Sequence, residues 1–355
     1  MKIKILTSLI IIAAISLVIF FGFRKAIPFN TQKVNKQEVK IHEENNTYTV
    51  VYTSFTNPTS KLITYDQSGK AIEEFPVKDI GLENLIFQNN ILYFSSRYSG
   101  NYYTFDNKSV QKHSIPSSWG ITNSFANPNG IHFITNGGQF VKDNKPYYKS
   151  GLVNVEGENQ KEFKYEKGFF TTGISYKDFY YVLTFDPSIE QEQVLKIDSN
   201  GEAVKAFNLG NKPQVGHKSM AVSGDKIYLV SDKGKMFTIF EDSIKELELP
   251  TKSKVFQVLE DNGKVFILYY SGEVVVISGE EITNHFKLEQ KNKNPIINMK
   301  ALINKNSLHI LSLYDGENKS EGIIQKYNIN NGKLEQSVTL PKEKDLKIST
   351  FELTR

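Results

Sequence analysis

Hydrophobic and polar residues alternate along most of this chain in short runs, and turn-forming residues separate the runs. The apolar runs are rich in Val, Ile, Tyr and Phe, and segments such as Asn89-Asn90 and Ser223-Gly224-Asp225 bound them. This combination is typical of β-strands joined by tight hairpins. No segment after residue 30 shows a sustained helical period. The pattern therefore predicts an all-β fold.

The same pattern recurs seven times along the chain. The most apolar run of each repeat spans 48–53, 91–96, 131–136, 179–185, 226–231, 264–270 or 308–314. Their centres are separated by 43, 40, 49, 47, 38 and 44 residues, a mean of about 43.5. A period of ~40–45 residues is typical of four-stranded propeller blades, and sandwiches or barrels need no such period. We expect a seven-bladed β-propeller, with six or eight blades as alternatives because two intervals are long.

The ends of the repeat array predict how the ring closes. Four short strands fit each period, as residues 216–250 show. The first run, 48–53, lacks the innermost strand that precedes its counterparts, and residues 347–355 (KISTFELTR) follow the seventh repeat as an extra strand. We expect this C-terminal strand to complete blade one, because an open array would leave unpaired strand edges.

Three of the outer hairpins share a sequence pattern that resembles the pattern of known propellers. Residues 62–77, 194–210 and 324–341 each run from an alternating strand to Asp or Asn, small polar residues, Gly and a last strand. This resembles the blade hairpin of quinoprotein-like and YVTN-type propellers, and more loosely that of WD-repeat propellers. There is no Trp-Asp dipeptide, a single tryptophan, Trp119, and no cysteine. The resemblance implies the fold and not the redox chemistry of the quinoproteins.

The N-terminus contains a long apolar segment. Ile5 to Phe23 is a run of 19 residues, of which three are polar. As a helix it spans about 28 Å, close to the hydrocarbon thickness of a bilayer. It is longer than the apolar region of a signal peptide and lacks a small-residue cleavage site. The run predicts an uncleaved anchor, with a cleaved signal peptide or a buried core helix as alternatives.

This anchor sets the expected organisation and location of the chain. Residues 1–25 form the membrane anchor, 26–40 a tether without periodicity, and 41–355 the propeller. We expect a single-pass protein of the cell membrane with the propeller outside the cytoplasm. The Lys-, Asn- and Ile-rich composition suggests a bacterial source.

Charge and composition exclude several classes of function. The formal net charge of +4 comes from the N-terminal residues, since residues 31–355 carry 39 basic and 39 acidic side chains. A neutral domain does not favour nucleic-acid binding, which needs clustered Lys and Arg. The absence of cysteine excludes disulfides, thiolate metal sites and cysteine nucleophiles.

The sequence contains no recognisable catalytic or metal-binding motif. The six histidines form no metal-binding pair in sequence. The segment Asp198-Ser199-Asn200-Gly201-Glu202 begins like a calcium loop but lacks its later Gly and Glu, which favours a hairpin turn. We therefore expect no cofactor and no metal, although spacing cannot reveal ligands that several blades bring to the axis.

One face of the propeller carries the candidate binding residues. Loops between the second and third strands and between blades meet at that face. They should present Arg97, Tyr98 and Tyr102 in blade two, Ser117-Ser118-Trp119 after it, and Asp186-Pro187 in blade four. Trp, Tyr and Arg are the types enriched at interaction hot spots.

The sequence predicts a non-catalytic binding or scaffold module for a protein or an envelope polymer. A rigid, neutral ring whose sequence contains no active-site motif favours this function. The alternative is a lyase or hydrolase whose groups converge at the axis, with His132, His217 and Glu260 as candidates. Oligomeric state is not determined by the sequence.

Overall fold

The computed structural model describes residues 47–354, with gaps at 107, 118, 143–144, 158, 187–190, 211–218, 232–233, 252, 290–295 and 315–319. The predicted anchor from Ile5 to Phe23 and the tether lie outside the described residues. Among the residues that are described, no helix is long and apolar enough to cross a membrane.

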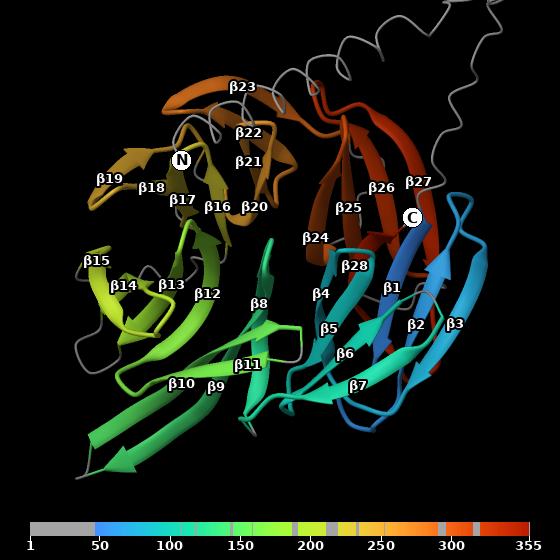
Figure 1. Ribbon diagram of the computed structural model, residues 1–355. Helices are drawn as coiled ribbons and strands as arrows, with labels where there is room; N and C mark the ends of the chain where they lie inside the picture. Colours follow the sequence, from blue (N-terminus) through green and yellow to red (C-terminus); the bar gives the residue numbers. More distant parts are fainter. Residues whose placement is uncertain are drawn as a thin grey trace, which may run out of the picture. The chain divides into compact units, whose positions relative to one another are not determined.

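The described residues form seven four-stranded antiparallel sheets arranged around a common axis, a seven-bladed β-propeller (Figure 1). Each blade is numbered from its place in the chain and its strands are given from the axis outward. Blades 1 to 3 contain β28 (Lys347–Thr354), β1 (Thr47–Thr53), β2 (Ser60–Tyr65), β3 (Ala71–Val77); β4 (Leu82–Gln88), β5 (Ile91–Ser96), β6 (Asn101–Phe105), β7 (Val110–Ser114); and β8 (Gly120–Asn127), β9 (Gly130–Lys142), β10 (Lys145–Glu156), β11 (Asn159–Tyr165). Blades 4 and 5 contain β12 (Phe169–Tyr176), β13 (Phe179–Asp186), β14 (Gln191–Ile197), β15 (Ala203–Asn208); and β16 (Ser219–Ser223), β17 (Lys226–Val230), β18 (Lys235–Phe240), β19 (Ser243–Glu248). Blades 6 and 7 contain β20 (Val255–Asp261), β21 (Lys264–Tyr269), β22 (Glu273–Ser278), β23 (Glu281–Lys287); and β24 (Ile296–Asn304), β25 (Ser307–Tyr314), β26 (Ser320–Asn328), β27 (Leu334–Pro341).

The predicted repeat corresponds to one strand position in every blade. Each of the seven apolar runs forms the second strand from the axis, which is β1, β5, β9, β13, β17, β21 or β25. This strand is flanked by partners on both edges and by neighbouring blades on both faces, so it is the most buried of the four. The prediction of seven four-stranded blades is confirmed, and the alternatives of six and eight are wrong.

The C-terminal strand closes the ring as predicted. β28 pairs antiparallel with β1, with Val50 opposite Phe351. Side chains add to the backbone ladder, since the hydroxyls of Thr47 and Thr49 each lie 2.9 Å from that of Thr354. Blade 1 is therefore built from the two ends of the described chain.

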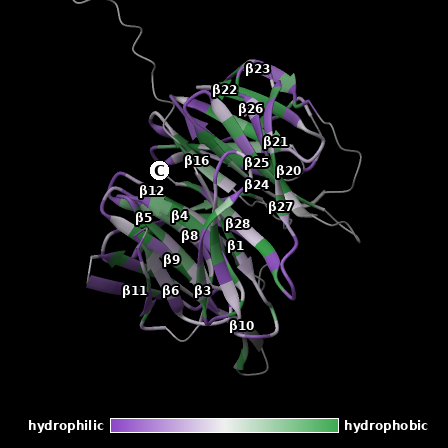
Figure 2. Cartoon of the chain, turned by 90° about the vertical axis from the view of Figure 1, so that its right-hand side faces the viewer, coloured by the Kyte–Doolittle hydropathy of each residue, from purple (hydrophilic) through white to green (hydrophobic). Residues whose placement is uncertain are grey.

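The core of the protein lies between the blades. Seven hydrophobic clusters of described residues occupy the seven blade-to-blade interfaces. At the closing interface, Tyr48 and Phe351 of blade 1 pack in one cluster with Leu311 of blade 7. Figure 2 shows hydrophobic residues on the strands with hydrophilic residues interspersed. Because each blade buries both faces, its inner strands are apolar on both sides.

The outer hairpin turns follow the Asp-x-x-Gly pattern for a local reason. The carboxylate of Asp198 accepts hydrogen bonds from the backbone N–H groups of Asn200 and Glu202, both at 2.9 Å. Gly201 has φ 89°, which a residue with a Cβ adopts only with strain. The Asp198 segment is thus a hairpin turn. This agrees with the sequence analysis, which favoured a turn over a calcium loop.

Candidate functional site

Two of the predicted face residues follow directly after β5. Arg97 is more than half exposed, and its Nη1 lies 3.6 Å from Oε1 of Glu83. Tyr98 is 54% exposed, and its ring meets that of Phe55 edge-on at 6.5 Å. Phe55 lies in the loop between β1 and β2 and is itself 42% exposed. The loops of blades 1 and 2 therefore present two adjoining exposed aromatic rings.

Trp119 lies beside this pair at the entrance to blade 3. The residue after it, Gly120, passes so close to Arg97 that a Cβ there would collide with the Arg97 carbonyl oxygen. The indole ring is half-buried and covers Gly137 of β9, where a Cβ would lie 2.5 Å from the ring. Gly120 and Gly137 thus let three chain segments approach closely, and these segments carry Arg97, Tyr98 and Trp119.

Tyr102 is not part of this face, and its prediction needs correction. It lies in β6 and is only 4% exposed. Its ring stacks on His113 at 4.8 Å and packs against Phe133 of blade 3 at 4.9 Å. Tyr102 therefore belongs to the core between blades 2 and 3. Of the other expected face residues, Ser117 and Asp186 are buried, and Ser118 and Pro187 lie outside the described residues.

A two-stranded ribbon extends this face beyond the blades. β9 and β10 pair on past the ends of their neighbours, up to Lys142 opposite Lys145 (Figure 1). Phe140 and Tyr147 face each other across the ribbon with ring centroids 5.5 Å apart, and Lys149 Nζ lies 5.3 Å from the centre of the Phe140 ring. Val141 is 71% exposed. The sequence signal for this ribbon was the 49-residue interval, the longest of the six.

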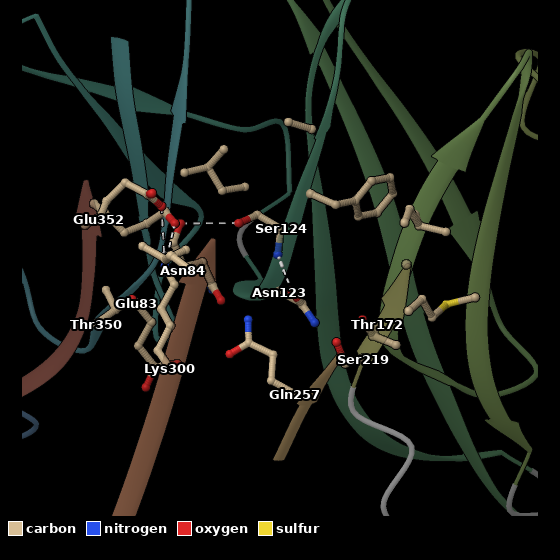
Figure 3. Close-up of a pocket in the computed structure, with 18 of the residues that line it drawn as sticks. Glu83, Asn84, Asn123, Ser124, Thr172, Ser219, Gln257, Lys300, Thr350 and Glu352 are labelled. Atoms are coloured by element: carbon tan, nitrogen blue, oxygen red, sulfur yellow. Dashed lines mark hydrogen bonds and ion pairs between the residues drawn. The ribbon is translucent and has the colours of Figure 1, made fainter. Parts of the chain in front are cut away.

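The axis of the propeller contains a polar cavity of about 760 Å³. Residues from all seven innermost strands line it, as Figure 3 shows for ten of them: Glu83, Asn84, Asn123, Ser124, Thr172, Ser219, Gln257, Lys300, Thr350 and Glu352. None of these residues was proposed from the sequence. They are far apart along the chain, so spacing gave no signal.

Most of the amides and hydroxyls in the cavity wall bind neighbouring blades. Within the described residues, six of the seven innermost strands carry a β-bulge, which leaves backbone groups without a ladder partner. Asn123 donates to the Thr171 carbonyl at 3.1 Å, and Ser124 to the Asn84 carbonyl at 3.3 Å. Gln257 similarly donates to the Ala301 carbonyl at 2.9 Å. These side chains join blades and are already satisfied.

Charged groups occupy the remaining arc of the cavity, in blades 7, 1 and 2. Lys300 Nζ donates to the Leu85 carbonyl at 2.9 Å and lies 3.7 Å from Oε2 of Glu352. Burial lowers the pKa of Lys300 and raises that of Glu352, while their mutual attraction opposes both shifts. Burial also raises the pKa of Glu83, against the opposing charge of Arg97. Ionisable groups with shifted pKa values in a cavity are typical of functional sites.

The described residues contain no group of three or more His, Asp or Glu side chains that would hold a metal ion. The residues expected at the axis for an enzyme are also elsewhere. His132 is buried between blades 3 and 4, and Glu260 is exposed, with Oε1 accepting from the Gly263 N–H at 2.9 Å. His217 lies outside the described residues.

Comparison with known proteins supports the fold alone. A scan against family models finds no match, and neither does a search of curated proteins. A functionally unknown protein from Desulfotomaculum acetoxidans is similar in structure, with a TM-score of 0.56 and 11% identity over 86% of this chain and 99% of that one. Sqt1 of Saccharomyces cerevisiae has a TM-score of 0.53 and 9% identity over 81% of this chain and 86% of its own. The computationally designed Ika8 protein has a TM-score of 0.50 and 13% identity over 81% and 86%. At these identities the likeness carries no information on function.

Proposed function

We propose that this protein is a membrane-anchored, extracytoplasmic propeller that binds a protein or an envelope polymer without catalysis. The observation that carries the proposal is a surface of exposed and half-buried aromatic side chains in the loops of blades 1 to 3. We call this surface the docking face and define it by Phe55, Tyr98, Trp119, Phe140 and Tyr147. Aromatic side chains that are exposed in neighbouring loops are typical of interaction sites.

The docking face is held rigid before any partner arrives. A Cβ at Gly81 would lie 2.6 Å from the ring of Tyr98, so that ring lies flat on the backbone. Trp119 is fixed in the same way over Gly137. Side chains that are already ordered lose little conformational entropy on binding, which favours affinity. Arg97 and Lys149 at its border supply the polar groups that surround the apolar centre of many interfaces.

The direction of β1 determines the face of the ring at which the described chain begins. β1 runs toward the loop 54–59, which belongs to the docking face, so Thr47 lies at the opposite face of the ring. A tether over residues 26–40 would join the ring at that opposite face. The docking face would then stay accessible to a partner outside the membrane.

A pull-down experiment tests the proposal. Residues 41–355, which include the compact unit 44–355, would be immobilised and exposed to envelope extracts. Trp119→Ala and Arg97→Glu should each release the partner. The first variant removes an aromatic contact residue of the docking face, and the second reverses a charge at its border. Ile72→Ala is the matched control, since Ile72 is 53% exposed but lies on the outer strand β3. Retention of every partner by both face variants would refute the docking face.

A lyase or hydrolase at the axis is the second candidate, because Glu83, Lys300 and Glu352 line the cavity. A carboxyl with a raised pKa is suited to act as a general acid. Turnover of fluorogenic glycoside and ester substrates, abolished in Glu352→Gln, would favour this candidate. Equal turnover by that variant would exclude Glu352 as the acid.

A further inference from the structure

The axial cavity has a shape suited to a small molecule. A second cavity of about 230 Å³ adjoins it, and Phe87, Leu302 and Glu352 line both. A volume of about 760 Å³ lies within the range of ~300–1,000 Å³ that is typical of ligand pockets. The ring is thus hollow along part of its axis, and Glu352 lies where the two cavities meet.

The cavity holds two pairs of opposite charges that are not closely bonded. Lys300 and Glu352 are 3.7 Å apart, and Arg97 and Glu83 are 3.6 Å apart. Both distances exceed that of a hydrogen bond. The side chains of Lys300, Glu352 and Glu83 keep 23%, 14% and 24% exposure, and all three line the cavity. Figure 3 shows these three on the same side, across from Thr172 and Ser219.

Of these charged side chains, Lys300 also bonds to another blade, through the Leu85 carbonyl, but most bonds between blades at the axis are made by neutral side chains. The blades are joined at the axis by neutral side chains such as Ser349, which donates to the Leu82 carbonyl at 2.6 Å, and Gln257. Buried ion pairs generally cost as much in desolvation as they return in attraction. Two loose pairs that line a cavity are therefore better explained by a ligand than by stability.

The charges also indicate what kind of ligand fits. The two pairs sum to zero, so a ligand with a net charge would leave that charge uncompensated in the cavity. A metal ion has no set of three acidic or histidine ligands in the described residues, and Lys300 would repel it. A ligand with one positive and one negative group can satisfy a carboxylate and an ammonium at once. Elsewhere in the lining, Phe125, Met220 and Phe256, each less than 10% exposed, form an apolar wall.

From this arrangement we infer that the axial cavity binds a zwitterionic α-amino acid with an apolar side chain. Its ammonium lies against Glu83 or Glu352, its carboxylate against Lys300 or Arg97, and its side chain against the apolar wall. The site adjoins the docking face at Arg97, which lines the cavity, and it needs no catalysis. Binding there would make the propeller a receptor for a small solute as well as for a macromolecule.

Calorimetric titration of the full chain in detergent tests the inference. L-phenylalanine and L-leucine should bind, whereas 3-phenylpropionate and phenethylamine should bind at least about tenfold more weakly, because each lacks one charge-assisted hydrogen bond. Failure of both amino acids to bind at millimolar concentration would overturn the inference. Equal binding of the acid-only or amine-only compound would overturn it too.

Two variants separate a ligand-binding role from a structural one. The double variant Lys300→Met and Glu352→Met removes a buried ion pair and replaces it with apolar side chains, a change that is often neutral or stabilising. It should stay folded, with a Tm lowered only by the loss of the Lys300 bond to the Leu85 carbonyl, and it should not bind L-phenylalanine. Glu83→Gln should weaken binding by about ten- to a hundredfold, and Glu281→Gln, on the exposed outer strand β23, should not change it. Full binding by the double variant and by Glu83→Gln would refute the site.

Discussion

His132 should make this propeller sensitive to mild acid. The side chain is fully buried in β9, between the rings of Phe125 at 5.0 Å and Tyr180 at 4.8 Å. Neither ring nitrogen has a hydrogen-bond partner among the described residues. Burial therefore lowers the pKa of His132 from 6.5 to about 4, against a small opposing effect of Glu156.

The sign of the effect follows from proton linkage. Below pH 6.5 the unfolded chain protonates this histidine and the folded chain does not, so the free energy of unfolding falls with pH until about pH 4. The loss is about 2 kcal/mol at pH 5 and about 3 kcal/mol at pH 4 for a pKa that drops from 6.5 to about 4. His309, whose pKa burial also lowers to about 4, should add a similar amount. Glu83 and Glu352 oppose the trend, because their raised pKa values let the folded state take up protons.

Replacing His132 isolates its contribution from these other groups. His132→Phe keeps an aromatic ring in an aromatic site, so urea unfolding should show equal or greater stability at pH 7.5. Between pH 7.5 and pH 5, the variant should lose about 2 kcal/mol less than the wild type. His285→Phe is the control, since that histidine is 43% exposed. If His132→Phe loses as much stability as the wild type, or if NMR titrates His132 near pH 6.5, the reasoning is wrong.

Three further predictions concern the ring and its loops. Deleting residues 345–355 removes β28 and should prevent folding, seen as loss of the thermal transition, and a synthetic peptide of those residues should restore it; an unchanged Tm would contradict ring closure. Asp79→Asn should cost about 2–3 kcal/mol in urea unfolding at pH 7.5, because the carboxylate accepts from Tyr103 at 2.6 Å and Asn101 at 2.9 Å. Burial raises the pKa of Asp79 but these bonds outweigh it and leave the pKa lowered, so this stabilisation should persist above pH 3.8 and fade only below it. Gly120→Ala should lower stability by about 1–3 kcal/mol, since its Cβ meets the Arg97 carbonyl; a neutral result would show that the two loops can separate.

The sequence predicted the fold well because a propeller repeats its most buried strand. The second strand of every blade is apolar on both faces. The spacing of these strands is therefore visible in the sequence without knowledge of any contact. The same property explains the error at Tyr102. In a blade that is buried on both faces, alternation does not tell which aromatic residue of β6 faces a loop and which faces a neighbouring blade. The ribbon was missed because its length depends on the register of β9 against β10.

The axial residues were beyond the reach of sequence reasoning for a geometric reason. Glu83, Lys300 and Glu352 belong to three different blades and meet only when the ring is closed. None of them stands in a local motif, and their residue types are common on surfaces. By contrast, Arg97, Tyr98 and Trp119 lie in two neighbouring loops, where chain proximity made their grouping predictable.

The pairing of β28 with β1 couples folding to the order of synthesis. The first strand of the ring is made early, yet its partner on the axial side is made about 300 residues later. Until β28 has been made, the axial edge of β1 and one apolar face of blade 1 remain exposed. During synthesis these surfaces need to be shielded by another molecule. In the extracytoplasmic location that we propose, this delay would keep the chain unfolded enough to pass through a translocation channel and would confine its final folding to the far side.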